Sequence, residues 1–275
     1  MAEQDRLEFL GSVFDLRGRS ALVTGAGSGL GAAMAAALAR AGAGVVLADV
    51  DEAAAKAECA ALRAEGLTVS PAALDVGARE QIEAGLDLAE RAHGAVDIVF
   101  ANAGISGGRG PRYGGRIEDV PHETWQNALR VNLDGVFFTL QAAARRMRGR
   151  GGRIVVTASL AGVRGDTMVG YPYIASKAAV VNLVRQAALD LADDDVLVNA
   201  ILPGPFAGTN IGAPADSPEK AALNKDFATT VPLGRVAHTD EMRGLALFLA
   251  SPASSFVTGT AFAIDGGSLA GQFTA

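Results

Sequence analysis

The stretch that decides the fold is TGAGSGLG, which runs from Thr24 to Gly31. A short apolar run at residues 21–24 leads into it, and an Ala-rich run of helical length at residues 30–41 follows. Glycines let the backbone turn sharply and approach a pyrophosphate, whose charge is favoured by the free N–H groups and positive dipole of a helix N-terminus. A glycine string also suits a tight strand-to-helix turn, but the strand before it and the helix after it favour a dinucleotide phosphate site.

The same alternation of strand and helix continues along the chain. Strand-like runs occupy residues 21–24, 45–49, 68–74, 98–101, 154–157, 196–202 and 261–264, and helical runs occupy residues 30–41, 52–65, 79–93, 123–148, 174–192 and 239–250. Such alternation is typical of βαβ units, and strands without polar alternation are buried on both faces. We therefore predict an α/β Rossmann fold, a doubly wound seven-stranded parallel sheet with helices on both faces.

Nothing in the composition divides the chain, so we expect one dinucleotide-binding catalytic domain at residues 14–275, preceded by an N-terminal extension at residues 1–13. The extension carries apolar residues that either pack on a neighbouring subunit or fray. Residues 204–235 are too long for an ordinary connection in a compact domain, which favours a functional segment, and we assign them to substrate. The Gly-rich residues 104–115 are predicted to form a loop.

A carboxylate at the end of the second predicted strand bears on the choice of cofactor. Asp49 is placed where it can accept hydrogen bonds from both hydroxyls of the adenosine ribose, and it would repel a 2′-phosphate. No Arg or Lys lies at residues 48–51 or inside the glycine loop to offset that repulsion. An ordinary surface Asp is the alternative, but the context favours NAD over NADP.

Tyr173 and Lys177 lie four residues apart at the start of a predicted helix, on one face and one turn apart. A tyrosine is a poor base at its usual pKa of about 10, but a nearby ammonium favours the phenolate. In isolation the pair is more typical of an ordinary exposed helix face.

The pair is not isolated. Asn102-Ala103-Gly104 follows the fourth strand, Ser159 the fifth and Pro203-Gly204 the sixth, and Asp265-Gly266-Gly267 closes the pattern. Together with the glycine loop, these motifs resemble the classical short-chain dehydrogenase/reductase family, over nearly everything from about Phe14 to Gly267.

The resemblance implies a single domain, usually a homotetramer, that moves a hydride between nicotinamide and an alcohol or ketone carbon. It implies that Tyr173 is the general acid/base, that Lys177 lowers the Tyr173 pKa and holds the nicotinamide ribose, and that Ser159 binds the substrate oxygen. Asn132 would support a water relay to Lys177; an ordinary helix Asn is the alternative. The remaining implied cofactor residues are Gly25, Ser28, Gly29, Leu30, Gly31, Asp49, Asp75, Val76, Asn102, Ala103, Gly104, Pro203, Gly204, Phe206 and Thr209.

Three departures from the family pattern border the expected substrate pocket. The loop at residues 104–118 is long and rich in Gly and Arg, and Ser159 to Tyr173 spans one position more than is frequent. Thr209 comes one place later than the family's threonine because Gly208 looks inserted. This insertion puts the contact of Thr209 with the nicotinamide carboxamide in question.

Composition narrows the class of protein further. A net charge of −6 and a sequence pI near 5.1 argue against a nucleic-acid surface, which needs a basic stripe. The single cysteine, Cys59, excludes an intrachain disulfide, and no His or Cys pair has metal-ligand spacing, so no metal site is predicted. The N-terminus is acidic and polar, unlike a signal peptide, and no uncharged run spans a bilayer, so we expect a cytoplasmic protein without membrane contact.

Three functional hypotheses remain open. The first is an NAD-linked dehydrogenase of a small secondary alcohol, such as a sugar, polyol, diol or cyclic alcohol. The second is a 3-oxoacyl thioester reductase. Such an enzyme needs basic residues for a carrier, and the long loop supplies Arg109, Arg112 and Arg116. The third is a catalytically silent dinucleotide-binding regulator, which the presence of all four implied active-site residues argues against.

Overall fold

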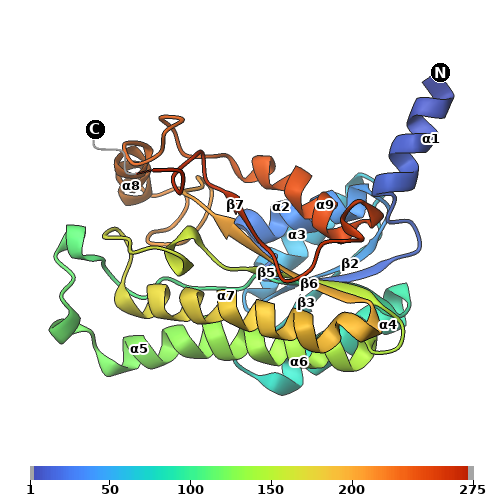
Figure 1. Cartoon of the computed structure of the whole chain (residues 1–275), viewed down its shortest axis with the longest axis horizontal. Helices are drawn as coiled ribbons and strands as arrows, with labels where there is room; N and C mark the ends of the chain where they lie inside the picture. Colours follow the sequence, from blue (N-terminus) through green and yellow to red (C-terminus); the bar gives the residue numbers. More distant parts are fainter. Residues whose placement is uncertain (1–2, 272–275) are drawn as a thin grey trace.

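Seven parallel strands form one sheet in the order β3-β2-β1-β4-β5-β6-β7 in the computed structural model, which describes residues 3–271 (Figure 1). The strands are β1 (Ser20–Thr24), β2 (Gly44–Asp49), β3 (Val69–Ala73), β4 (Val96–Ala101), β5 (Gly152–Thr157), β6 (Val196–Pro203) and β7 (Ala261–Ile264). The strand order reverses between β1 and β4, and ligands of such sheets bind beyond the carboxyl ends of the strands at that reversal. The predicted fold class is confirmed.

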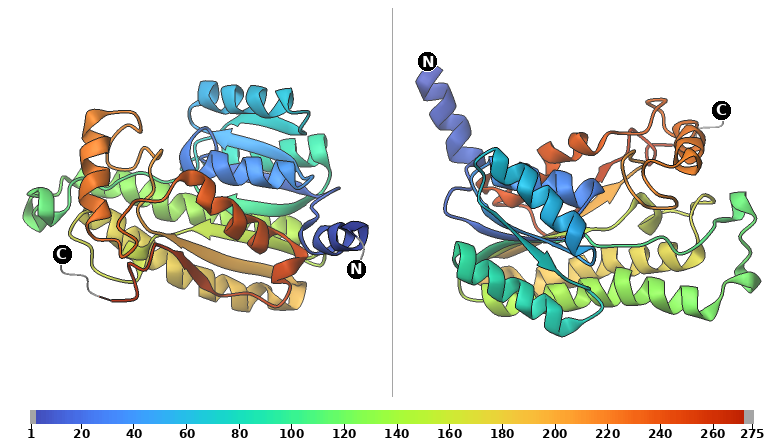
Figure 2. Two further views of the ribbon diagram at one scale, coloured as in Figure 1. Left: turned by 90° about the horizontal axis from the view of Figure 1, so that it is seen from above. Right: turned by 180° about the vertical axis from the view of Figure 1, so that it is seen from behind.

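Helices cover both faces of the sheet, as Figures 1 and 2 show. One layer holds α2 (Gly29–Arg40), α3 (Glu52–Ala64) and α9 (Arg243–Ala250), and the other holds α4 (Arg79–His93), α5 (His122–Leu129), α6 (Gly135–Met147) and α7 (Tyr171–Leu191). Successive strand residues serve opposite cores: Leu22 packs toward α4 and α6, and Val23 packs toward α2 and α9. Burial on both faces explains why the strands lack polar alternation.

Two further helices lie where the sequence indicated no regular structure. The N-terminal extension forms α1 (Glu3–Phe14), which projects from the body of the molecule and leaves Phe9 exposed (Figures 1 and 2). Residues 204–235, predicted to be irregular, contain α8 (Pro218–Ala228). Ser217 caps α8 by accepting a hydrogen bond from the Lys220 N–H, and Pro218 occupies its first turn, which is a recognised start signal.

No helix among residues 3–271 is both long and apolar enough to cross a bilayer.

Candidate active site

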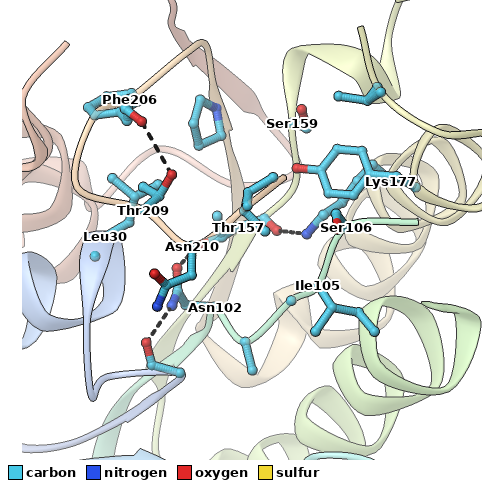
Figure 3. A pocket seen from close by; sticks show the side chains of 18 of the residues that line it. Leu30, Asn102, Ile105, Ser106, Thr157, Ser159, Lys177, Phe206, Thr209 and Asn210 are labelled. Carbon is cyan, nitrogen blue, oxygen red and sulfur yellow. Dashed lines mark hydrogen bonds between the residues drawn. The ribbon is translucent and has the colours of Figure 1, made fainter. Parts of the chain in front are cut away.

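A cavity of about 610 Å³ lies beyond the carboxyl ends of the central strands, and part of its wall is drawn in Figure 3. Every residue that the sequence assigned to the cofactor lines it. Ser159, Tyr173 and Lys177 line the same cavity, whereas Asn132 is buried behind its wall. The structure therefore brings together side chains from both halves of the sheet, as expected at the reversal of strand order.

The glycine loop is packed too closely to accept side chains. A Cβ added to Gly25 would lie 2.8 Å from Ala103 Cα, and one added to Gly31 would overlap the carbonyl oxygen of Gly25. Gly25 and Gly29 also have positive φ angles of 64° and 58°, which L-residues with side chains rarely adopt. The loop thus presents bare backbone at the N-terminus of α2, the geometry that suits a phosphate group.

Asp49 turns its carboxylate toward this loop from the end of β2. Its Oδ2 accepts a hydrogen bond from the Gly27 N–H at 2.9 Å, and its Oδ1 accepts one from the Asp51 N–H at 3.0 Å. Each oxygen keeps a lone pair for a further donor. The carboxylate is therefore held at the wall of the cavity while it retains the capacity to accept from ribose hydroxyls.

A polar network joins the ends of β1, β4 and β5 beneath the cavity. The Asn102 amide donates to the carbonyl oxygen of Thr24 at 3.0 Å, and the Thr157 hydroxyl donates to Asn102 Oδ1 at 3.0 Å. Lys177 Nζ donates in turn to the Thr157 carbonyl at 2.7 Å, a contact drawn in Figure 3. These hydrogen bonds tie the ends of β1, β4 and β5 together beneath the cavity.

Tyr173 and Lys177 meet as the spacing predicts, with Lys177 Nζ 5.7 Å from the centre of the Tyr173 ring. Burial lowers the pKa of Lys177 to about 8. Burial also raises the pKa of Tyr173, and its hydrogen bond with Ser159 acts in the opposite direction. The Lys177 ammonium thus lies beside the Tyr173 ring while it donates to the Thr157 carbonyl, and Ser159 contributes a hydrogen bond that favours the Tyr173 phenolate.

Ser159 begins a short 3-10 turn at the end of β5 and is itself buried. Its Oγ accepts a hydrogen bond from the Ala161 N–H at 3.1 Å, which orients the side chain. That contact uses a lone pair and leaves the hydroxyl hydrogen for a partner in the cavity.

Asn132 sits in a single π-helical turn, Arg130–Asp134, which interrupts what the sequence predicted as one continuous helix. Its Oδ1 accepts from the Ile105 N–H at 2.8 Å, and its Nδ2 donates to the Ile105 carbonyl at 2.9 Å. A Cβ added to Gly104 would lie 3.3 Å from Asn132 Oδ1 and 3.5 Å from Lys177 Nζ, so both side chains converge in front of Gly104. Such π-turns often mark functional positions.

An ion pair that the sequence did not indicate, between Arg130 and Asp75, lies in the cavity wall. Arg130 Nη1 contacts both carboxylate oxygens of Asp75, at 3.0 and 2.9 Å, and the Gly77 N–H donates to Asp75 Oδ1. Arg130 begins the π-turn, so this pair connects the turn to the loop that follows β3.

The questioned residue Thr209 does line the cavity. Gly208 has a positive φ of 72°, and the turn that it permits returns the chain to the cavity wall. The Thr209 hydroxyl donates to the Phe206 carbonyl at 3.2 Å (Figure 3). It also accepts a hydrogen bond from Lys220 Nζ at 3.0 Å. The insertion is thereby absorbed locally.

On the side of the cavity expected to hold substrate, the loop at residues 104–118 contacts both Val169 and the helix α8. Arg109 of the long loop forms an isolated bridge with Val169, and the Tyr113 hydroxyl donates to Asp226 of α8 at 3.0 Å. Lining residues that the sequence analysis did not name include Asn127, Arg164, Asp166, Val169, Lys220, Asn224, Phe227 and Thr230. The length of residues 204–235, the long loop at residues 104–118 and the extra position between Ser159 and Tyr173 had pointed toward this part of the site.

Comparison with known proteins gives a consistent picture. The family model described as "Enoyl-(Acyl carrier protein) reductase" matches residues 25–268. The 2-dehydro-3-deoxy-D-gluconate 5-dehydrogenase of Bacillus subtilis (strain 168) is 36% identical over 261 residues, which are 94% of this chain and 98% of the relative. The sorbitol dehydrogenase of Cereibacter sphaeroides is 34% identical over 92% of this chain and 98% of its own.

A solved structure gives the same result in three dimensions. The crystal structure of a gluconate 5-dehydrogenase from Burkholderia cenocepacia J2315, in complex with NADP and tartrate, has a TM-score of 0.84 and 36% identity. The match covers 95% of this chain and 99% of that one.

Proposed function

Since the chain belongs to the classical short-chain dehydrogenase/reductase family and is an oxidoreductase that acts on alcohols, we propose that it uses NAD to interconvert a small secondary alcohol and its ketone. The observation that carries this proposal is the meeting of Tyr173, Lys177 and Ser159 in the cavity that the glycine loop and Asp49 also line. Residues 14–275 would form the catalytic domain.

The residues present fit a dinucleotide. The glycine loop offers a cradle that any Cβ at Gly25 or Gly31 would fill, and Asp49 supplies acceptors for ribose hydroxyls. When bound, the nicotinamide supplies or accepts the hydride. Asp75 and Tyr173 both line this one cavity, so the residues proposed for the adenine and for the reacting carbon face the same space.

The chain's own groups would handle the proton and the developing charge. In alcohol oxidation, Tyr173 as phenolate takes the hydroxyl proton of the substrate while Ser159 donates a hydrogen bond to the same oxygen. In ketone reduction, Tyr173 returns that proton. Lys177, anchored on Thr157, holds the nicotinamide ribose, and Asn132 supports the water relay to Lys177 from its π-turn.

Replacing Ser159 by Ala should shift the pH dependence of alcohol oxidation toward higher pH. In the free enzyme the hydrogen bond from Ser159 lowers the Tyr173 pKa, so its loss raises that pKa further and leaves less phenolate near neutrality. We expect kcat/KM to fall by about 10²–10³-fold near neutral pH, and by less under alkaline conditions, where the phenolate is recovered. A pH profile of kcat/KM with the same midpoint as the wild type would contradict this role.

The choice of NAD rests on Asp49 and on the lack of any Arg or Lys at residues 48–51. Replacing Asp49 by Ala should narrow the preference for NAD over NADP by about tenfold or more, because the carboxylate that repels a 2′-phosphate is removed. The measurement is kcat/KM with each cofactor on one active alcohol. Asp51→Ala removes a neighbouring carboxylate and serves as the control; unchanged discrimination in Asp49→Ala would place the ribose contact elsewhere.

For the substrate we propose a sugar, polyol, diol or cyclic alcohol. The relatives named above carry sugar and polyol names, and Asp166, Asn224 and Thr230 give the substrate end of the cavity hydrogen-bonding groups. Three arginines favoured the alternative hypothesis of a 3-oxoacyl thioester reductase. They are exposed and lie outside the described lining of the cavity: Arg109, Arg112 and Arg116. This placement favours a free alcohol or ketone.

We also propose a cytoplasmic homotetramer that binds neither nucleic acid nor membrane. The single, buried Cys59 fits a reducing compartment, and the net charge of −6 disfavours phosphate backbones. On the helices of one layer, Phe137 of α6 and Leu189 of α7 are 45% and 77% exposed, which supports burial against other subunits.

A further inference from the structure

Lys220 is a buried cation that none of the roles above uses. Its residue is only 3% exposed, and its side chain lines the cavity from the first turn of α8. Lys220 Nζ donates to Thr209 Oγ1 at 3.0 Å and to the Ile211 carbonyl at 2.9 Å, both of which are neutral acceptors. Within residues 3–271, no carboxylate lies within 4.0 Å of it. A buried ammonium without an anion is unfavourable, and its place beside the positive end of a helix dipole adds to the cost.

The acceptors of Lys220 belong to a segment that lies against the glycine loop. A Cβ added to Gly29, the first residue of α2, would lie 3.4 Å from the Gly208 carbonyl oxygen and 3.7 Å from Thr209 Cγ2. Asn210 Nδ2 donates to Ser28 Oγ at 3.4 Å, and Figure 3 shows Thr209 and Asn210 beside Leu30. Lys220 therefore holds the segment that covers the N-terminus of α2.

The helix N-terminus by itself would leave most of the charge of a bound diphosphate uncompensated. The diphosphate of a dinucleotide carries two negative charges, whereas a helix N-terminus supplies the equivalent of about half a positive charge. The glycine loop itself contains no Lys or Arg. Of the other cations in the cavity lining, Arg130 is paired with Asp75, Arg164 faces Asp166 at 3.8 Å, and Lys177 is anchored on Thr157 beside Tyr173.

We propose that Lys220 is a cofactor-binding residue, which supplies positive charge to the diphosphate from the first turn of α8. This proposal rests on the proposed use of a dinucleotide. The Tyr113 hydroxyl donates to Asp226 of the same helix, so α8 is also tied to the long loop at residues 104–118. An anionic group on the substrate is the competing partner for Lys220, and a binding measurement without substrate separates the two.

The test is the affinity of ADP-ribose, which contains the diphosphate but no nicotinamide, measured by displacement of NADH fluorescence. Lys220→Met should raise the Kd of ADP-ribose by about 10- to 100-fold, as expected for a lost charge-assisted contact. The Kd of adenosine, which has no phosphate, should stay within about twofold. Lys220→Arg should restore most of the ADP-ribose affinity.

Lys225→Met is the matched control, because it removes the same charge from the exposed side of the same helix. It should leave the affinities for both ligands unchanged. An unchanged Kd for ADP-ribose in Lys220→Met would overturn the proposal. If KM for an acidic substrate rose in the same variant, the partner of Lys220 would be the substrate and not the diphosphate. An equal loss of affinity for adenosine would also overturn the proposal, since that result would show that the cavity wall around α8 had been damaged. Because the readout is binding alone, it stands even if no alcohol is turned over.

Discussion

Replacing Tyr173 by Phe is expected to lower kcat by about 10²–10⁴-fold while NADH binds with nearly unchanged affinity. The change removes only the hydroxyl that exchanges a proton with the substrate oxygen. The ring that packs 5.7 Å from Lys177 Nζ remains, so the cavity wall keeps its shape. Turnover is followed by nicotinamide absorbance and binding by NADH fluorescence.

Tyr171→Phe provides the control for that variant. Tyr171 begins the same helix, α7, but is not part of the described cavity lining. Its replacement should leave kcat within about twofold of the wild type. Wild-type turnover in Tyr173→Phe would refute the assigned acid/base, whereas loss of turnover in both variants would indicate damage to the start of α7.

Replacing Gly31 by Ala is expected to abolish measurable NADH binding, through at least about a 100-fold rise in Kd. A Cβ at this position would overlap the Gly25 carbonyl oxygen and approach Asn102 Nδ2 to 2.6 Å. Both are backbone-anchored parts of the cradle, so the glycine loop must move to accommodate the methyl group. NADH titration by fluorescence measures the effect, and circular dichroism checks that the protein is folded.

The matched control is Gly244→Ala in α9, another helical glycine, where a Cβ would meet nothing within 4 Å. That variant should bind NADH normally and be more stable by about 0.5–1 kcal/mol, because Ala is the better helix former. Normal NADH affinity in Gly31→Ala would show that the cradle does not hold the cofactor.

The strand pattern predicted the sheet because both of its faces are buried, so each strand appears as an apolar run. The positions of the motifs expected to bind the cofactor could be predicted because the carboxyl ends of parallel strands lie at one edge of the sheet. The loops that follow β1, β2, β4 and β5 therefore lie close together. Asn102 and Ser159 could therefore be placed beside the glycine loop from their positions, whereas the roles expected of them came from the family resemblance.

Other features had weak signals or none. The start of α8 was readable in Ser217-Pro218, but the surrounding Gly and Pro obscured it. The π-turn at Arg130–Asp134 carries no compositional mark, because it is defined by hydrogen bonds rather than by residue type. The contact between Tyr113 and Asp226 joins residues 113 positions apart and depends on how the loops pack, which the sequence pattern does not specify. The same holds for the hydrogen bond between Lys220 and Thr209.

The most direct test of the account is the initial rate of nicotinamide reduction with NAD and with NADP, against a panel of sugars, polyols, diols, cyclic alcohols and 3-hydroxyacyl thioesters. The account predicts turnover with NAD on at least one free secondary alcohol, lost in Tyr173→Phe. Activity confined to thioesters, or to NADP, would contradict it.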